Sequence, residues 1–219
     1  MGTIERDLME CCTGCDSNKV TERKKSMERL SELLMDSQTA KILGRSDSGN
    51  NLTWDSLFHS VHKLILKEAD RFRAEEQKPQ SSSSSQTNRE NMKLKCSALI
   101  DNVVTKAIKG VPELKCSNVM FCILQILNDV YLRKCFGRTY LLILKEILRV
   151  RKYWGDMTSD DWNELLDVCF MLYEEPPTGL DKAPVAEILY WIVKCGTLQS
   201  HLGLQLRKKF PPLARAFKD

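Results

Sequence analysis

The sequence lacks long uncharged apolar segments. No stretch of its 219 residues approaches the ~20 consecutive apolar residues of a membrane-spanning helix, so we expect no membrane contact. The first residues include Glu5, Arg6 and Asp7 and no apolar core, which predicts that no signal peptide is present. The nine cysteines, an odd number, lie mostly inside apolar helical patterns, as is typical of a reducing compartment. We therefore expect an intracellular protein of the nucleus or cytosol.

Motifs of common enzymes are also missing. The ten glycines form neither G-x-G-x-x-G nor G-x-x-x-x-G-K, so no phosphate-binding loop is expected. No G-x-S-x-G, H-E-x-x-H or kinase catalytic motif occurs. The three histidines, His59, His62 and His201, are too few for most histidine-based catalysis, and we expect His59 and His62 on a solvated helix face. The sequence thus predicts no catalytic residue and no cofactor.

Cys12 and Cys15 form an isolated C-x-x-C beside Cys11. A structural zinc site would need a second pair of ligands at a suitable spacing, and none follows nearby. A thioredoxin-like redox site would need a preceding strand, and none is predicted. We interpret the pair as a cysteine-rich helix end without metal. Six other cysteines are expected to be small buried apolar side chains: Cys96, Cys116, Cys122, Cys135, Cys169 and Cys195.

Strand-like alternation is nearly absent, whereas helical periodicity occurs almost throughout. The clearest helix follows the N-cap candidate Thr53 and carries an apolar stripe beginning at Trp54. Another follows Ser159 and ends near Pro176, and a third covers Val185 to Cys195 with Gly196 as its C-terminal glycine. Further helices are predicted at about 3–13, 20–35, 37–43, 90–109, 117–133, 139–153 and 198–209.

Successive amphipathic helices without strands predict an all-α fold, and we favour an α-solenoid of antiparallel helix pairs. No repeat of fixed period is visible, and a compact helical bundle is the alternative. Residues 75–91 contain no aliphatic or aromatic side chain, which predicts a disordered serine-rich loop over 77–90. The predicted domains are therefore N-terminal helices over 1–76, this loop, and helical repeats over 91–219 that continue into a longer solenoid.

Arg23 lies in the middle of an apolar helical stripe. A guanidinium aimed at a neighbouring helix is costly unless it is paired and hydrogen-bonded. We therefore predict that Arg23 bonds a carboxylate or helix-end carbonyls of a preceding helix, with Asp7 and Glu10 as candidates. The functional alternative is a basic recognition patch or nuclear-import signal with its two lysine neighbours. The stripe consists of Val20, Met27, Leu30 and Leu34.

The charge balance gives little support for nucleic-acid binding. The net charge of +4 arises from 33 basic and 29 acidic residues spread along the chain, whereas nucleic-acid-binding modules concentrate positive charge on one face. Direct DNA contact through basic helices around 24–29 and 145–152 remains an alternative to protein binding. In the second helix, Lys145, Arg149 and Lys152 form a candidate stripe.

The segment around Arg23 also has a recognisable spacing. Lys19, Glu22 and Arg23 occupy the basic, acidic and arginine positions of a motif whose flanking aliphatic positions hold Cys15 and Met27. This pattern resembles the N-terminal motif of the ataxia-telangiectasia mutated (ATM) family of protein kinases. Further stretches resemble vertebrate members of that family in order and spacing: 21–25 (TERKK), 52–55 (LTWD), 114–116 (LKC), 144–148 (LKEIL), 150–154 (VRKYW) and the helix from Trp162 to Tyr173.

The resemblance covers most of residues 1–200 and implies a fold, a function and partners. It implies the N-terminal part of a long solenoid of HEAT-like repeats in a nuclear serine/threonine kinase of the phosphatidylinositol 3-kinase-related group. The catalytic domain of such a kinase lies far C-terminal to this region. The resemblance implies a docking surface for DNA-damage and telomere-maintenance partners, including the break-sensing complex that contains nibrin, and a homodimeric full-length protein. It also makes Ser85, in a Ser-Gln pair, a candidate phosphorylation site.

Overall fold

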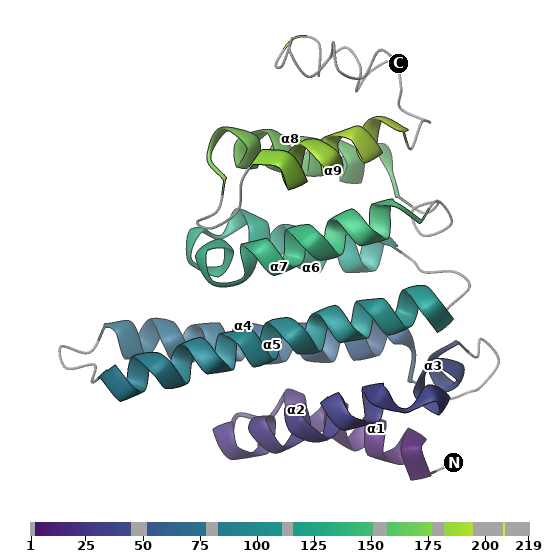
Figure 1. The fold of residues 1–219 in the computed structure, drawn as a ribbon, viewed down its shortest axis with the longest axis vertical. Helices are drawn as coiled ribbons and strands as arrows, with labels where there is room; N and C mark the ends of the chain where they lie inside the picture. The colour runs from purple at the N-terminus through teal and green to yellow at the C-terminus, as the bar shows by residue number, and fades with distance from the viewer. Residues whose placement is uncertain are drawn as a thin grey trace. The chain divides into compact units, whose positions relative to one another are not determined.

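A computed structural model describes residues 3–44, 52–77, 83–110, 116–150, 157–176 and 182–194, together with Lys208. Across these residues the chain forms nine helices and no strand (Figure 1), which confirms the all-α prediction. No helix in the described ranges has the length and apolarity that crossing a membrane requires. The chain divides into two compact units, residues 1–114 and 115–219, and we describe each by itself.

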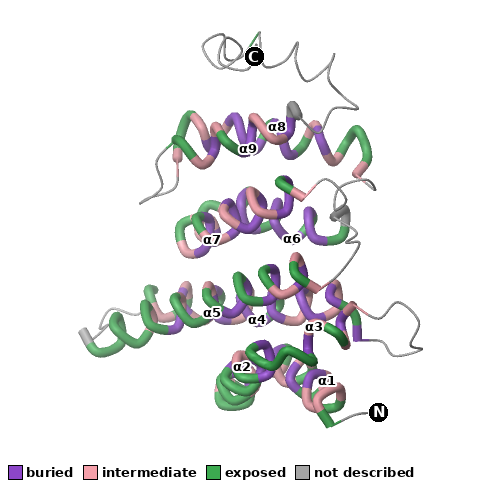
Figure 2. Tube along the Cα trace, turned by 45° about the vertical axis from the view of Figure 1, so that its right-hand side comes forward, coloured by how far each residue is buried: buried purple, intermediate pink, exposed green. Residues whose placement is uncertain are grey.

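Unit 1 contains two long helical pairs and one short helix. The first pair packs together across a short turn, the second forms a long antiparallel hairpin, and the short helix contacts the last one (Figure 1). Buried residues recur along its helices, and the first turns of the last helix are exposed (Figure 2). The helices are α1 (Thr3–Cys15), α2 (Val20–Met35), α3 (Ser37–Leu43), α4 (Trp54–Glu76) and α5 (Ser83–Gly110).

Helix α4 begins where the sequence predicts. The Thr53 hydroxyl accepts a hydrogen bond from the Ser56 N–H at 3.1 Å, and the Ser56 hydroxyl accepts one from the Thr53 N–H at 2.9 Å. This reciprocal capping box satisfies two backbone donors that a helix start leaves open. The Trp54 indole N–H donates to the Val103 carbonyl at 3.1 Å, which fixes the start of α4 against α5.

The boundary between α2 and α3 is a single residue, Asp36. Its carboxylate accepts the Gln38 N–H at 2.8 Å, which caps α3. The buried Thr39 hydroxyl donates to the Leu33 carbonyl at 2.6 Å and so satisfies a carbonyl at the end of α2. Both helices have the bounds that the sequence predicts, 20–35 and 37–43.

Helix α5 begins earlier than predicted. The prediction of a disordered loop over 77–90 is wrong for residues 83–90, which form the first turns of α5, while 78–82 lie outside the described residues. Arg89 lies 3.4 Å from Glu76 of α4, and Lys93 lies 2.9 Å from Glu90. Ion pairs of this kind support a polar helical segment that precedes the apolar face of the same helix. In α5 the buried apolar face begins at Met92.

The described part of unit 2 contains four helices in two pairs. Helix α6 (Cys116–Asn128) packs on α7 (Val130–Leu148), and α8 (Ser159–Glu174) packs on α9 (Lys182–Lys194). The pairs meet through contacts of α6 with α8 and of α7 with α9. Their shared core contains Phe136, Tyr140, Trp162, Leu166 and Ile188.

Two boundaries in unit 2 differ from the sequence prediction. The predicted helices over 117–133 and 139–153 are instead separated at Asp129, whose carboxylate accepts the Leu132 N–H at 2.8 Å and caps α7. Arg133 donates to the Leu127 carbonyl at 2.6 Å and satisfies the end of α6. The cap of α8 is Thr158, not Ser159, because Thr158 forms a capping box with Asp161. Residues 151–156 and 195–207, including His201, lie outside the described residues.

Candidate partner-binding site at the N-terminal motif

Arg23 of α2 is buried in unit 1, with 4% of its surface exposed. Its Nε donates to Glu68 Oε1 at 2.8 Å, and its Nη2 lies 2.7 Å from the same oxygen. Its Nη1 donates to the carbonyls of Ser17 and Asn18 at 3.0 and 3.1 Å. The Arg23 guanidinium therefore joins helix α2 to helix α4 and to the α1–α2 turn through hydrogen bonds.

Glu68 is 1% exposed and lies between two guanidinium groups. Its second oxygen accepts from Arg71 Nε at 2.8 Å, and Arg71 also pairs with Glu75 at 2.6 Å. A buried ionic group is tolerated when every lone pair and donor finds a charge-assisted partner, as happens here. We call Arg23, Glu68, Arg71 and the carbonyls of Ser17 and Asn18 the Arg23 cluster.

The sequence correctly predicts that Arg23 bonds a carboxylate and backbone carbonyls, but the predicted carboxylate partners are wrong. Arg23 does bond a carboxylate and carbonyls that follow the end of α1, but the carboxylate is Glu68, not Asp7 or Glu10. Asp7 instead binds Arg29 at 2.6 Å. Glu68 lies on the buried stripe of α4, so the signal that singled out Arg23, a charge on an apolar stripe, was present for it as well.

The remaining motif residues divide between the interior and the surface. Met27 is buried, whereas Lys19 and Glu22 are exposed and pair with each other at 2.9 Å. The Ser17 hydroxyl donates to the other Glu22 oxygen at 2.5 Å and accepts from the Lys19 N–H at 3.1 Å. Hydrogen bonds from Ser17 and then Lys19 lower the pKa of the Glu22 carboxyl. The exposed pair therefore lies at the start of α2, next in sequence to the Ser17 and Asn18 carbonyls that the buried Arg23 binds.

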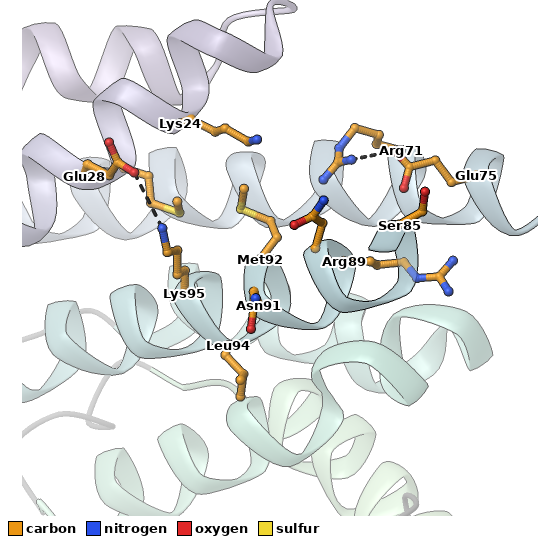
Figure 3. Close-up of a pocket in the computed structure, with 12 residues that line it drawn as sticks. Lys24, Glu28, Arg71, Glu75, Ser85, Arg89, Asn91, Met92, Leu94 and Lys95 are labelled. Carbon is orange, nitrogen blue, oxygen red and sulfur yellow. Dashed lines mark hydrogen bonds and ion pairs between the residues drawn. The ribbon is translucent and has the colours of Figure 1, made fainter. Parts of the chain in front are cut away.

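Ser85 is exposed in the first turns of α5, not in a mobile loop. It lines a groove between α2, α4 and α5 that encloses about 820 Å³ (Figure 3). Lys24 and Lys95 extend into the same groove from α2 and α5 (Figure 3). Sequence periodicity does not reveal this groove, because its residues come from three helices that are separate in the chain.

Cys11, Cys15 and Cys96 are buried, and Cys12 is partly exposed. Burial raises the pKa of Cys11 to about 11 and those of Cys15 and Cys96 to about 12. Burial likewise raises the pKa of Cys12. Of the six cysteines expected to be buried, Cys96, Cys122 and Cys169 are buried, Cys135 is partly exposed, and the side chains of Cys116 and Cys195 lie outside the described residues. No set of three or more metal-ligating His, Cys, Asp or Glu side chains occurs in the described ranges.

The two histidines of α4 do not share a solvated face. His62 is 3% exposed and stacks on Phe58 with ring centroids 6.5 Å apart, so the prediction for His62 is wrong. His59 is partly buried, with its Nδ1 2.8 Å from the Asp55 carbonyl oxygen. The apolar stripe of α4 is wide enough to include His62 because this helix packs against both α1 and α5.

Three basic residues of the DNA-binding alternative, Arg29, Lys145 and Arg149, are paired with carboxylates. Arg29 binds Asp7 and Glu32, at 2.6 and 3.0 Å. In unit 2, Lys145 lies 3.6 Å from Glu187, and Arg149 lies 3.2 Å from Glu146. Lys152, the third residue of that stripe, lies outside the described residues.

Comparison with known proteins identifies the family. A sequence model of the family TAN, described as telomere-length maintenance and DNA damage repair, matches residues 8–163. The serine-protein kinase ATM of Sus scrofa is 33% identical over 198 residues, which cover 89% of this chain and 6% of that kinase. The matched range includes the Arg23 cluster, its exposed motif residues and most of the groove-lining helices. The chain therefore belongs to the telomere-length maintenance and DNA damage repair family, as an N-terminal segment of the ATM kinase type.

Proposed function

We propose that this chain is a non-catalytic docking and scaffold segment of a serine/threonine kinase of the phosphatidylinositol 3-kinase-related group. On this proposal the full-length protein acts in the nucleus, with some in the cytoplasm, at the DNA double-strand-break checkpoint and in telomere maintenance. It forms a homodimer, and its catalytic domain lies outside this chain. Membership of the TAN family and the similarity to ATM support the proposal, although the chain spans only 6% of that relative's length.

The observation that carries the docking role is the division of the motif between inside and outside. The buried Arg23 cluster holds the α1–α2 turn, and the exposed Lys19–Glu22 pair lies on that turn and its neighbouring helix. A surface that is fixed before binding loses less conformational entropy when a partner binds. We therefore assign Lys19 and Glu22 to partner contact, and Arg23 and Met27 to holding them in place.

The helical pairs support a HEAT-like solenoid. Among the described helices, α1/α2, α4/α5, α6/α7 and α8/α9 form successive pairs of helices that pack on each other. Repeated pairs of this kind expose ridges and grooves to which partner segments bind without any reactive group. A nibrin-containing complex is the partner that the family membership favours.

Affinity titration of the 219-residue chain against the C-terminal segment of nibrin tests the docking role. The double variant Lys19→Ala/Glu22→Ala should keep the wild-type melting curve in circular dichroism and lose at least tenfold in affinity. Arg23→Ala should lower both the melting temperature and the affinity. Lys25→Ala, an exposed change on the same helix, is the control and should bind as wild type. Wild-type affinity of the double variant would exclude the Lys19–Glu22 surface as the docking site.

Direct DNA contact is the alternative function, and its salt dependence distinguishes it. Binding to a DNA duplex through phosphate contacts releases counterions, so affinity should fall steeply between 50 and 200 mM salt, on the order of 10³-fold for six or more contacts. The ion pairs of Arg29, Lys145 and Arg149 with neighbouring carboxylates argue against such a surface.

A further inference from the structure

The groove between α2, α4 and α5 is lined by apolar, amide and charged side chains. Its lining includes the buried side chains of Met27 and Met92 and the amides of Asn88 and Asn91. Methionine is adaptable and recurs at surfaces that accept varied partners. The residues that line the groove include four cations, Lys24, Arg71, Arg89 and Lys95, and two carboxylates, Glu28 and Glu75. Arg71 and Arg89 also pair with Glu68 and Glu76, which do not line the groove.

Two of these cations have incomplete partners. The Arg89 side chain is 11% exposed, its Nε has no hydrogen-bond partner, and its ion pair with Glu76 is long, at 3.4 Å. A buried donor without an acceptor is unfavourable, and a partner carboxylate that reaches this donor would satisfy it. Lys24 extends over the groove, and no carboxylate pairs with it in the described part of the chain (Figure 3).

The spacing of the cations favours several separate carboxylates over one compact anion. Arg89 and Lys95 are six residues apart on α5, about 9 Å along the helix axis, and Lys24 reaches in from α2. From Ser85 to Lys95 the α5 wall extends about 15 Å, the length of ten helical residues of a partner.

We propose that this groove binds an Asp/Glu-rich helical segment of a protein partner. The apolar side chains of that segment would contact Met27 and Met92, and its carboxylates would pair with Lys24, Arg89 and Lys95. The inference rests on the proposed docking function and adds the partner's chemistry and place. It predicts that Glu28 limits affinity, because its carboxylate already competes for Lys95 at 3.6 Å (Figure 3).

The probe is a synthetic fluorescent 15-residue peptide with leucines on one helical face and glutamates on the other, titrated with the 219-residue chain by anisotropy. Lys24→Glu should weaken binding at least fivefold, and Lys25→Glu, the same charge change on the adjacent exposed residue, should leave it within twofold. Glu28→Gln should strengthen binding at least twofold, while Glu32→Gln, one turn along α2 and paired with Arg29, should not. Circular dichroism confirms that each variant is folded.

Three outcomes overturn the groove proposal: equal effects of the Lys24 and Lys25 variants, equal binding of a glutamine version of the peptide, or preference for a singly phosphorylated neutral peptide. The docking function is judged separately, with the nibrin segment. If that segment binds and Lys24→Glu leaves its affinity unchanged, docking stands and this groove is not its site. If the acidic peptide binds as described and the nibrin segment does not, the groove stands and the proposed partner is wrong.

Discussion

At the scale of single residues, we expect the buried Arg23–Glu68 ion pair to be important for the stability of unit 1. Arg23→Ala leaves Glu68 buried with Arg71 as its remaining cation, and loss of one partner from a buried pair costs about 3–5 kcal/mol. Arg29→Ala, which removes the ion pairs of an exposed arginine with Asp7 and Glu32, should destabilise the chain far less. Urea denaturation followed by circular dichroism measures both, and equal losses would contradict a special role for Arg23.

The same pair allows a double-mutant test. Arg23→Leu and Glu68→Leu should each destabilise strongly, because each leaves a charge buried without its main partner. The double variant replaces both charges with apolar side chains and should recover about 2 kcal/mol relative to the sum of the single losses. Additive losses in the same urea experiment would show that the two side chains act independently.

The buried cysteines set a pH limit on unit 1. Burial raises the native pKa of Cys11 to about 11 and of Cys15 and Cys96 to about 12, above the ~8.5 of an unfolded thiol. Raised native pKa values stabilise the fold below the unfolded pKa, and that stabilisation is lost as pH rises toward the native values. The free energy of unfolding should therefore fall from about pH 9 upward, and Cys15→Ala should make the fall shallower.

Iodoacetamide labelling at pH 8, read by mass spectrometry, checks the same thiols in the native state. Cys11, Cys15 and Cys96 should label at least tenfold more slowly in the folded chain than in urea, because the thiolate is the reactive form and each site is buried. Rapid native labelling of Cys96 would contradict its burial on α5.

At the scale of helices, α3 and α5 approach closely at two glycines. A methyl group on Gly44 would lie 2.5 Å from the Gly110 carbonyl oxygen, which is backbone and has little room to move. Gly44→Ala should therefore destabilise the chain by roughly 1–3 kcal/mol. Gln38→Ala, on the exposed face of α3, should be nearly neutral in the same urea denaturation. A neutral Gly44→Ala would mean that the two helices separate without cost.

Ser85 lies in the first turns of α5 and lines the groove between α2, α4 and α5. A negative charge at Ser85 would compete with the carboxylates of a bound acidic segment for the groove cations. Ser85→Glu should therefore weaken binding of the acidic peptide about threefold or more. Ser84→Glu places the same charge on the adjacent exposed residue, which does not line the groove, and should change affinity less than twofold. If both variants bind alike, the effect is general charge and not occupation of the groove.

Helices were predictable from sequence where local signals decide them. The cap at Thr53 and the boundary at Asp36 are set by side chains within three residues of the helix start, so the pattern located α2, α3 and α4. The α6–α7 boundary was misplaced because Asp129 interrupts an apolar pattern that continues on both sides of it. The start of α5 was missed because its support comes from Glu76 on another helix.

The site was less predictable, because its partners are distant in sequence. Arg23 stood out as a charge on an apolar stripe, but its partner Glu68 is 45 residues away, and periodicity carries no information about which helices meet. His62 was misassigned because two helices cover α4, so its buried face is wider than one stripe. The groove required the positions of three helices at once.

At the scale of the whole molecule, the two units have separate cores. The Arg23 cluster lies entirely within residues 1–114, and its hydrogen bonds join α2, α4 and the α1–α2 turn. Loss of the cluster should lower the stability of the helices that it joins. The core of unit 2, around Tyr140 and Trp162, contains none of these contacts.

Native-state hydrogen exchange of Arg23→Ala tests this separation. Amides of α1, α2, α4 and α5 should exchange at least tenfold faster than in the wild type, because opening of unit 1 becomes less costly. Amides in the centres of α7 and α8 should change less than twofold if unit 2 opens independently. Mutation of a unit 2 core residue, Trp162→Ala, should produce the reverse pattern. Equal acceleration in both units after either mutation would show that the chain opens as one cooperative body, so that a partner bound at the N-terminal motif would stabilise all of it.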